Sequence, residues 1–152
     1  MGGHTQSMAN LQPASIQIVS VPINELNSAP YNPRQWSETQ TTQLQTSIER
    51  FGFVDPNLVN GAKERRNVVI GGHFRLKVAQ EIGLKTVPVV YLDIANINDE
   101  KALNLRLNRN TGSWNYDLLK EMDISLLLDT GFDDTDLSIM WERKTKRITF
   151  LL

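Results

Sequence analysis

The chain has 152 residues, of which 40% are hydrophobic and 22% charged, so it is long enough to form a globular domain with a hydrophobic core. Its formal net charge of −1 excludes a polycation, and any contact with nucleic acid must come from a local basic cluster. The absence of cysteine excludes disulfides, thiolate zinc sites and cysteine nucleophiles. No apolar run is long enough to span a bilayer, and we expect a cytoplasmic protein without a membrane partner.

The N-terminal part of the chain is expected to change from a tail to a strand and then to a rigid loop. Residues 1–14 lack periodicity and are predicted to be a flexible tail or an expression remnant. Residues 16–21 alternate as a strand does. The following loop carries Pro30 and Pro33, each of which restricts the residue before it to extended conformations.

A helix and a second strand are predicted next. Ser37 followed by Gln40 has the pattern of a capping box, and Gly52 is placed to end the helix that this box begins. Residues 53–59 then read as a turn that leads into a strand, and the pair Asn60-Gly61 is a strong turn signal.

Residues 67–83 are predicted to form a strand, a two-glycine turn and a helix. Residues 67–70 are mostly β-branched, and Gly71 with Gly72 allows a sharp turn. Phe74, Val78 and Ile82 recur at four-residue spacing, and Gly83 stands where a glycine commonly follows a helix.

The remaining elements are predicted to be one strand and several helices. Residues 87–92 form the strand, in which Pro88 indicates an edge position or a strand start. Asn98 is expected to cap a helix that ends at residues 111–113. A further helix is expected over residues 117–128, and one or two more turns over residues 133–140.

The chain divides into four predicted parts. They are the tail, a nucleotide- or phosphate-binding core over residues 15–112, a helical extension over residues 113–141, and a tail or linker over residues 142–152.

The turn from Gly71 to Arg75 is the strongest candidate for a binding site. A helix N-terminus offers free N–H groups and a positive dipole end, and a guanidinium beside it favours an anion. A second interpretation stays open, in which this is a tight turn whose Arg75 pairs with a surface carboxylate. His73 is a candidate catalyst, although a histidine here is more often a hydrogen-bond partner within the turn.

Arginine residues elsewhere are weaker candidates. Arg34 lies in the proline-stiffened loop, and Arg106 and Arg109 are three residues apart, so that one helical face carries both. Each of these is also consistent with an ordinary solvated side chain. No H-x-x-x-H spacing typical of a metal site is present, and the acidic residues Asp55, Asp93, Asp99 and Glu100 are scattered along the chain.

Several segments, taken in order, resemble the ParB/sulfiredoxin-like domain. They are Asn32-Pro33-Arg34, residues 51–59 and residues 70–79, followed by residues 84–90. The resemblance runs from about Ile16 to Asn110. It is closest to the ParB-like domains that precede phage and bacterial DNA methyltransferases, because residues 107–109 and 114–131 are similar to the helical extension of that branch.

The resemblance implies an α+β fold with a small mixed β-sheet, flanking helices and a C-terminal helical extension. In ParB proteins the G-x-x-R-x-x-A turn binds the triphosphate of CTP, so the resemblance implies a nucleoside triphosphate, CTP or ATP, as ligand. The residues that it implies at the nucleotide are Gly71, Gly72, His73, Arg75, Arg34 and Arg109, with Val54, Asp55 and Pro56 at the base end.

Three departures from the family limit what is expected. The E-N-x-x-R pattern that helps ParB proteins to hold metal and nucleotide corresponds here to residues 105–109, where only Arg109 matches and an acidic residue is missing. Phosphate binding is therefore expected, whereas Mg²⁺ and hydrolysis stay open. No ParB-type helix-turn-helix domain is expected in this chain, and sulfiredoxin chemistry is excluded because it needs a cysteine.

Three functional hypotheses follow. The leading one is a ParB-like nucleotide-binding module in a DNA transaction such as partitioning or DNA modification, in a phage or plasmid setting, with nucleotide, DNA, a fused or separate DNA methyltransferase and a second copy of the chain as candidate partners. The alternative is a ParB-like nuclease or NTPase. The third is a DNA-backbone-binding module, whose candidate contacts are Lys63, Arg65, Arg66, Arg106 and Arg109.

Overall fold

A computed structural model describes residues 16–151, with the side chains of residues 16–142. Its centre is a four-stranded sheet with the order β1-β4-β2-β3. The strands are β1 (Val19–Pro22), β2 (Asn57–Asn60), β3 (Val69–Gly71) and β4 (Thr86–Leu92). β4 pairs antiparallel with β1 and parallel with β2, and β2 pairs antiparallel with β3. The expected α+β fold with a small mixed sheet is therefore confirmed.

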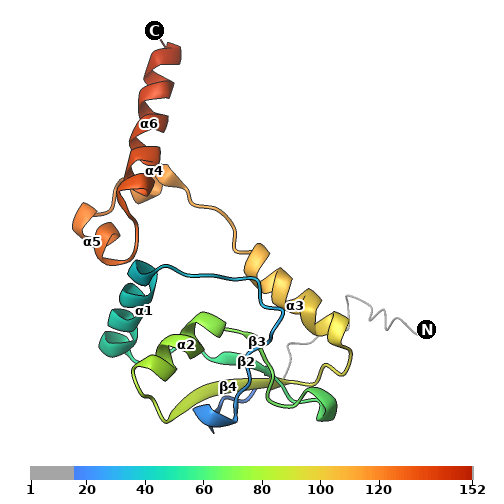
Figure 1. Ribbon diagram of the computed structural model, residues 1–152. Coiled ribbons are helices and arrows are strands. Elements are labelled where there is room, and N and C mark those ends of the chain that lie inside the picture. Colours follow the sequence, from blue (N-terminus) through green and yellow to red (C-terminus); the bar gives the residue numbers. More distant parts are fainter. Residues whose placement is uncertain (1–15, 152) are drawn as a thin grey trace.

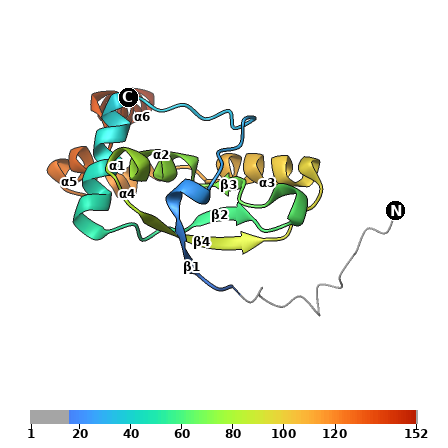
Figure 2. The ribbon, with the colours of Figure 1, turned by 60° about the horizontal axis from the view of Figure 1, so that its bottom comes forward.

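Three helices lie on the same side of this sheet, and the first of them packs chiefly against the second (Figure 2). They are α1 (Glu38–Phe51), α2 (His73–Glu81) and α3 (Ile97–Arg109). Two short 3-10 turns, η2 (Ile23–Glu25) and η3 (Lys63–Arg65), connect strands to the next elements. The core forms where Leu76 and Ala79 of α2 pack on inward-facing valines of β2, β3 and β4.

The local signals predicted for the start of α1 and for the ends of α1 and α2 are confirmed. Ser37 accepts a hydrogen bond from the Gln40 backbone, and the Gln40 side chain accepts one from the Ser37 backbone, which completes the capping box of α1. Gly52 and Gly83 follow α1 and α2 with φ of 86° and 81°, a region that glycine enters without steric cost.

Pro88 contradicts the prediction that it marks an edge or a strand start. It lies inside β4, which is an inner strand with a neighbour on each side. The register with β1 pairs Pro88 with Ser20, but the register with β2 begins one residue later, at Val89. Pro88 therefore faces a paired strand on one side only, which is how an inner strand tolerates a residue without an N–H group.

The start of α3 was also predicted at the wrong residue. Asn96, not Asn98, is the N-cap, because its side-chain oxygen accepts hydrogen bonds from the backbone N–H groups of Asn98 and Asp99. Asn96 and Asn98 both have the side chain that is preferred at an N-cap. The position of the turn after β4 places Asn96 there.

The C-terminal extension follows α3 in the chain and lies above α1 in the view of Figure 1. It forms three helices, α4 (Tyr116–Leu119), α5 (Ile124–Asp129) and α6 (Asp134–Leu151). The single helix predicted over residues 117–128 is wrong, because the chain leaves the helical path between α4 and α5. Asp123 caps α5 by accepting a hydrogen bond from the Ser125 N–H, so a new helix starts there.

Two of the predicted boundaries between the parts of the chain can be compared with the described residues. α6 runs continuously through the predicted start of a tail or linker at residue 142. The predicted N-terminal tail, residues 1–14, lies outside the described residues. Within the described part of the chain, no helix combines the length and the apolar character that crossing a bilayer requires.

Candidate functional site

The turn between β3 and α2 has the backbone shape that the sequence predicted. Gly72 is the N-cap of α2, with φ 90° and ψ 26°. A Cβ atom added at Gly72 would lie 2.6 Å from Nη2 of Arg75 and would also collide with the side-chain nitrogen of Asn57. Only glycine fits here, since two polar side chains close on its Cα. The first N–H groups of α2 have no partner inside the helix and carry its positive dipole end.

Asn57 is a site residue that sequence reasoning missed. It lies at the start of β2, is fully buried, and donates from Nδ2 to the carbonyl oxygens of Gly71 (3.1 Å) and Gly72 (2.8 Å). The carbonyl oxygens of Gly71 and Gly72 thus both accept a hydrogen bond from the same side chain. The Asn57 Oδ1 atom is buried without a hydrogen-bond partner in the described structure, so the site holds an acceptor that a donor could satisfy. A polar residue at the start of a buried strand was the available signal.

Arg75 makes its contacts with the segment that precedes β2. Its Nε donates to the carbonyl oxygen of Asp55 at 3.0 Å and its Nη2 to that of Pro56 at 3.1 Å. Its Nη1 lies 3.3 Å from Oδ2 of Asp55. The structure therefore places Asp55 and Pro56 beside Arg75, and it contains the ion pair with a surface carboxylate that the second interpretation of the turn anticipated.

His73 is buried and faces the proline-stiffened loop. Its Nε2 accepts a hydrogen bond of 3.1 Å from the backbone N–H of Ala29. Burial lowers the pKa of His73, which keeps the imidazole neutral at pH 7 and leaves a lone pair for this bond. The contact gives His73 a role in holding the loop, and it needs no catalytic explanation.

The loop over residues 29–36 passes between α2 and α3 (Figures 1 and 2) and is tied to both helices. The Tyr31 hydroxyl donates to Oε2 of Glu100 on α3 at 2.7 Å. The ring of Trp36 stacks on that of Phe74 in α2, with centroids 4.7 Å apart and planes 6° from parallel. Between these anchors, Arg34 is exposed and makes no ion pair with the described residues. The loop thus presents a free guanidinium from a fixed backbone.

Glu100 on α3 is the second residue that the sequence reading missed. The acidic side chain sought at residues 105–109 is absent there, but Glu100 lies about two turns earlier and is fully buried. Arg65 donates to both of its oxygens, from Nε at 3.1 Å and from Nη2 at 2.7 Å, and Asn60 donates to Oε1 at 2.7 Å. This carboxylate joins α3, β2, η3 and the loop.

The pKa values in this network follow from burial and hydrogen bonding. Burial opposes the charge of Glu100, but the hydrogen bonds from Arg65, Tyr31 and Asn60 outweigh it and hold the pKa of Glu100 below its usual value. Burial and the bond to Glu100 raise the pKa of Tyr31. The network is a satisfied ion pair at neutral pH, and Arg65 is committed to it.

Two side chains of α3 also lie against the turn, near Ile70 and Gly71. Asn104 donates from Nδ2 to the carbonyl oxygen of Ile70 at 2.9 Å, and its buried Oδ1 is the other unpartnered side-chain oxygen in the described residues. Leu107 reaches to within 3.2 Å of where a Cβ at Gly71 would lie. A side chain at Gly71 would therefore press on Leu107 of α3, while Gly72 is required by the turn itself.

The remaining candidates lie away from these contacts. Arg109 and Arg106 are exposed near the end of α3, and Lys63 and Arg66 are exposed around η3. Arg66 lies over the ring of Tyr91, 5.6 Å from its centroid. Among residues 16–142 no group of three or more His, Cys, Asp and Glu side chains is arranged to hold a metal ion.

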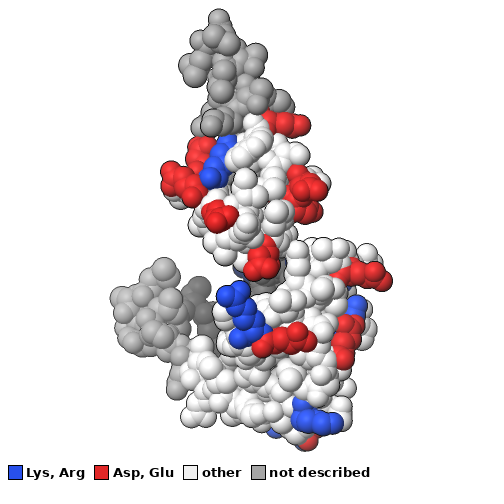
Figure 3. All heavy atoms as spheres, turned by 90° about the vertical axis from the view of Figure 1, so that its left-hand side faces the viewer, with Lys and Arg blue, Asp and Glu red and all other residues white. Residues whose placement is uncertain are grey.

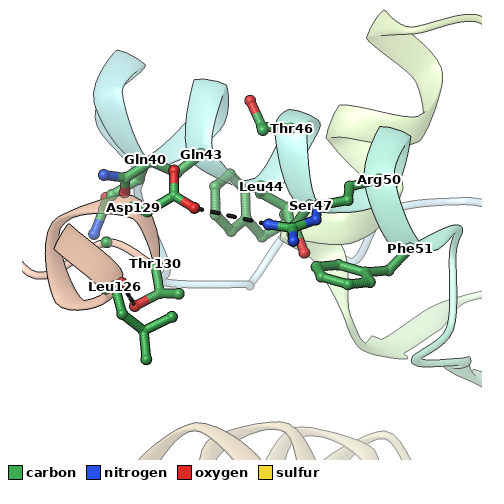
Figure 4. Close-up of a pocket in the computed structure, with 12 residues that line it drawn as sticks. Gln40, Gln43, Leu44, Thr46, Ser47, Arg50, Phe51, Leu126, Asp129 and Thr130 are labelled. Atoms are coloured by element: carbon green, nitrogen blue, oxygen red, sulfur yellow. Dashed lines mark hydrogen bonds and ion pairs between the residues drawn. The ribbon is translucent and has the colours of Figure 1, made fainter. Parts of the chain in front are cut away.

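A separate cavity of about 530 Å³ lies between α1 and α5. Figure 4 shows Arg50 and Asp129 reaching toward each other across it from these two helices. Carboxylates are spread over the extension in the view of Figure 3. The cavity also contains the ring of Phe74, next to the turn, and it marks where the extension meets the core.

Comparison with known families gives one match over most of the chain. The model of the family described as ParB N-terminal domain matches residues 7–111. The ParB-like nuclease domain-containing protein YnaK of Escherichia coli (strain K12) is 33% identical over 86 residues, which are 57% of this chain and 92% of that protein.

Longer proteins are also similar. The probable chromosome-partitioning protein ParB of Coxiella burnetii is 30% identical over 114 residues, 74% of this chain but only 38% of that protein. The chain thus spans well under half of that relative. Among solved structures, the truncated chromosome-partitioning protein ParB of Caulobacter crescentus complexed with CTP-gamma-S aligns with a TM-score of 0.59 and 24% identity, over 75% of this chain and 70% of that chain. This likeness supports the fold alone.

Proposed function

Since the chain belongs to the ParB N-terminal domain family, we propose that it binds a nucleoside triphosphate, CTP or ATP, at the turn from Gly71 to Arg75. The observation that carries the proposal is the cradle at Gly72, where any side chain would fill the space against Arg75 at the start of a nine-residue helix. The Caulobacter relative in complex with CTP-gamma-S makes a nucleotide the natural class of ligand to test.

The proposed division of roles follows the contacts. The N–H groups at the start of α2 and the Arg75 guanidinium would hold phosphate oxygens, and Arg34 would approach from the loop that His73 fixes. The unpartnered oxygens of Asn57 and Asn104 suit donors such as ribose hydroxyls or an amino group of the base. Arg109 is proposed as an outer contact only. The described residues offer no group of three or more ligands for Mg²⁺, so a Mg²⁺ ion bound with the nucleotide would be held mainly by the phosphates and water.

Calorimetric titration with CTP, ATP, GTP and ADP tests this proposal. We expect at least one triphosphate to bind, and we expect Arg75→Ala to abolish that binding. Lys77→Ala is the matched control, because Lys77 is exposed on the same helix and its removal changes the net charge equally. Because Arg75 also holds the segment before β2, the variant is compared with wild type by thermal unfolding. If wild type binds none of the four nucleotides, the proposal is wrong.

We further propose that the module acts in a DNA transaction, of which partitioning and DNA modification are the candidates. The exposed side chains of Lys63, Arg66, Arg106 and Arg109 are the proposed phosphate contacts, and Arg65 is omitted because Glu100 engages it on two nitrogens. DNA affinity measured by fluorescence anisotropy should fall steeply with added salt and should fall further when these four are replaced. A flat salt dependence would contradict the DNA contact.

The alternative function is that of a nuclease or NTPase. It is favoured by one observation, the similarity to a protein named for a ParB-like nuclease domain over 92% of its length. Metal-dependent cleavage of plasmid DNA that is lost with His73→Ala would support it. A DNA methyltransferase partner and a homodimer remain predictions, which co-purification and light scattering of the full chain can test.

A further inference from the structure

Arg75 is engaged by two kinds of partner in the structure. Two of its nitrogens donate to backbone carbonyl oxygens of Asp55 and Pro56, at 3.0 and 3.1 Å, which carry no net charge. The third, Nη1, lies 3.3 Å from the Asp55 carboxylate, which is the ionic partner of Arg75 within the described residues. The carbonyl contacts orient the guanidinium, while the carboxylate neutralises it.

The two members of this ion pair differ in their access to solvent. The Arg75 side chain is 27% exposed, whereas that of Asp55 is 70% exposed. Burial lowers the pKa of Arg75 and the nearby carboxylate opposes that shift, while the guanidinium stays charged and is favoured by an anion at its side. A phosphate oxygen would offer Arg75 the same kind of contact that the Asp55 carboxylate already makes.

Because of where Arg75 lies, a phosphate that bound it would be close to the Asp55 carboxylate. The Nη2 of Arg75 lies 2.6 Å from where a Cβ of Gly72 would be, so the guanidinium is close to the N-cap of α2. A polyphosphate bound to the first N–H groups of α2 would bring its negative charge close to the Asp55 carboxylate, and like charges at short range repel.

We propose that Asp55 is an intramolecular competitor that sets the affinity of the turn for polyphosphate. Its carboxylate occupies Arg75, and a polyphosphate binds by displacing that carboxylate toward solvent while the two carbonyl contacts stay in place. This inference rests on the proposed function, since it assumes that polyphosphate binds at Arg75.

The test is Asp55→Asn, which removes the charge but keeps the backbone carbonyl that Arg75 uses. The probe is inorganic tripolyphosphate, titrated by calorimetry at constant ionic strength without divalent cations. We expect binding about two- to fivefold tighter than that of wild type, the range set by an exposed ion pair. The gain should shrink as salt is added, because salt screens the pair and the repulsion together. Asp99→Asn is the matched control: Asp99 is an exposed carboxylate on α3, and its removal should leave the affinity unchanged.

The outcomes separate this inference from the proposed function. If Arg75→Ala abolishes tripolyphosphate binding but Asp55→Asn binds equally or more weakly, Asp55 positions Arg75 and the competition is wrong. If Asp55→Asn weakens binding only when Mg²⁺ is added, the carboxylate is a cation ligand and the competition is again wrong. If Arg75→Ala leaves the affinity of wild type unchanged, the proposed site itself is wrong.

Discussion

The sheet core and the C-terminal extension are built on very different amounts of buried apolar surface. In the core, nine buried residues from β1, η2, β2, β3, α2 and β4 form one cluster. Among the side chains described up to residue 142, the buried cluster of the extension has three members, Leu119, Leu127 and Met140, with Tyr116, Phe132 and Leu137 packed against it. Several large apolar side chains of the extension stay exposed, among them Trp114, Leu118, Met122, Ile124, Leu126 and Leu128. The core can therefore hold a site rigidly, whereas the described part of the extension, residues 113–142, rests on a small buried cluster.

The contact between the two regions is correspondingly light. Arg50 and Asp129 approach only to 3.8 Å, and both side chains are about two-thirds exposed. The cavity of about 530 Å³ separates α1 from α5 beside this pair. By contrast, the loop that carries Arg34 is held by a buried carboxylate and a ring stack. Parts of the chain that shape the turn are therefore fixed by burial, while the extension is joined to them mainly through the chain after α3.

The strongest test of the core is Glu100→Ala. Removing one member of a buried, hydrogen-bonded ion pair leaves Arg65 without its partner and should lower the free energy of unfolding by about 3–5 kcal/mol. Denaturant unfolding measures this loss. Glu100→Gln keeps the shape but loses the charge, and we expect it to cost less. A loss below about 1 kcal/mol in Glu100→Ala would show that the network is not what holds α3 to the sheet.

The corresponding test of the extension is Met140→Ala. Met140 is fully buried in a three-residue cluster, and its truncation should cost about 2–5 kcal/mol locally. We expect amides of α4 and α5 to lose protection from hydrogen exchange while those of β2 and β4 keep it. Met122→Ala is the matched control, because Met122 is 47% exposed. Simultaneous loss of protection in both regions would mean that they unfold as one unit.

Acid should weaken the core through His73 before it weakens Glu100. Burial sets the pKa of His73 below its unfolded value, so the unfolded chain binds the proton first and stability falls as the pH drops below about 6.5. The pKa of Glu100 is also lowered, so its contribution is present above about pH 4.5 and is lost as the pH falls through the folded value. Denaturant unfolding between pH 8 and 5 measures how the free energy of unfolding falls with pH because of His73. In His73→Gln this fall should become smaller. An unchanged slope in that variant would exclude His73 as its source.

The smallest effect is expected for Asp129→Asn. An exposed pair at 3.8 Å contributes no more than about 1 kcal/mol, and we expect unfolding to be nearly unchanged. Asp129 is the better member to change, since Arg50 also lies 4.9 Å from the centre of the Phe51 ring. A double-mutant cycle with Arg50→Met measures the coupling directly. A coupling well above 1 kcal/mol would mean that this contact does fix the extension on α1.

The sequence by itself determined the features that depend on a few neighbouring residues. The capping box at Ser37, the end of α2 at Gly83 and the turn at Gly72 each require a backbone geometry that only a small set of residues supplies. The strand–turn–helix unit and the family resemblance could be recognised for the same reason. Where two residues satisfied the same local rule, as Asn96 and Asn98 do at the start of α3, the sequence did not decide between them.

Tertiary structure alone decided the contacts between distant parts of the chain. Glu100 meets partners 35, 40 and 69 residues away, and Asn57 reaches carbonyls 14 and 15 residues away, so that no local pattern identifies the partners of either residue. The same holds for Arg75: the residue spacing left a phosphate and a surface carboxylate open as its partner and the family resemblance favoured the phosphate, whereas the fold brings Asp55 beside it. Local backbone preferences act within a few residues, whereas the burial and pairing of a charge depend on which strands and helices the fold makes neighbours.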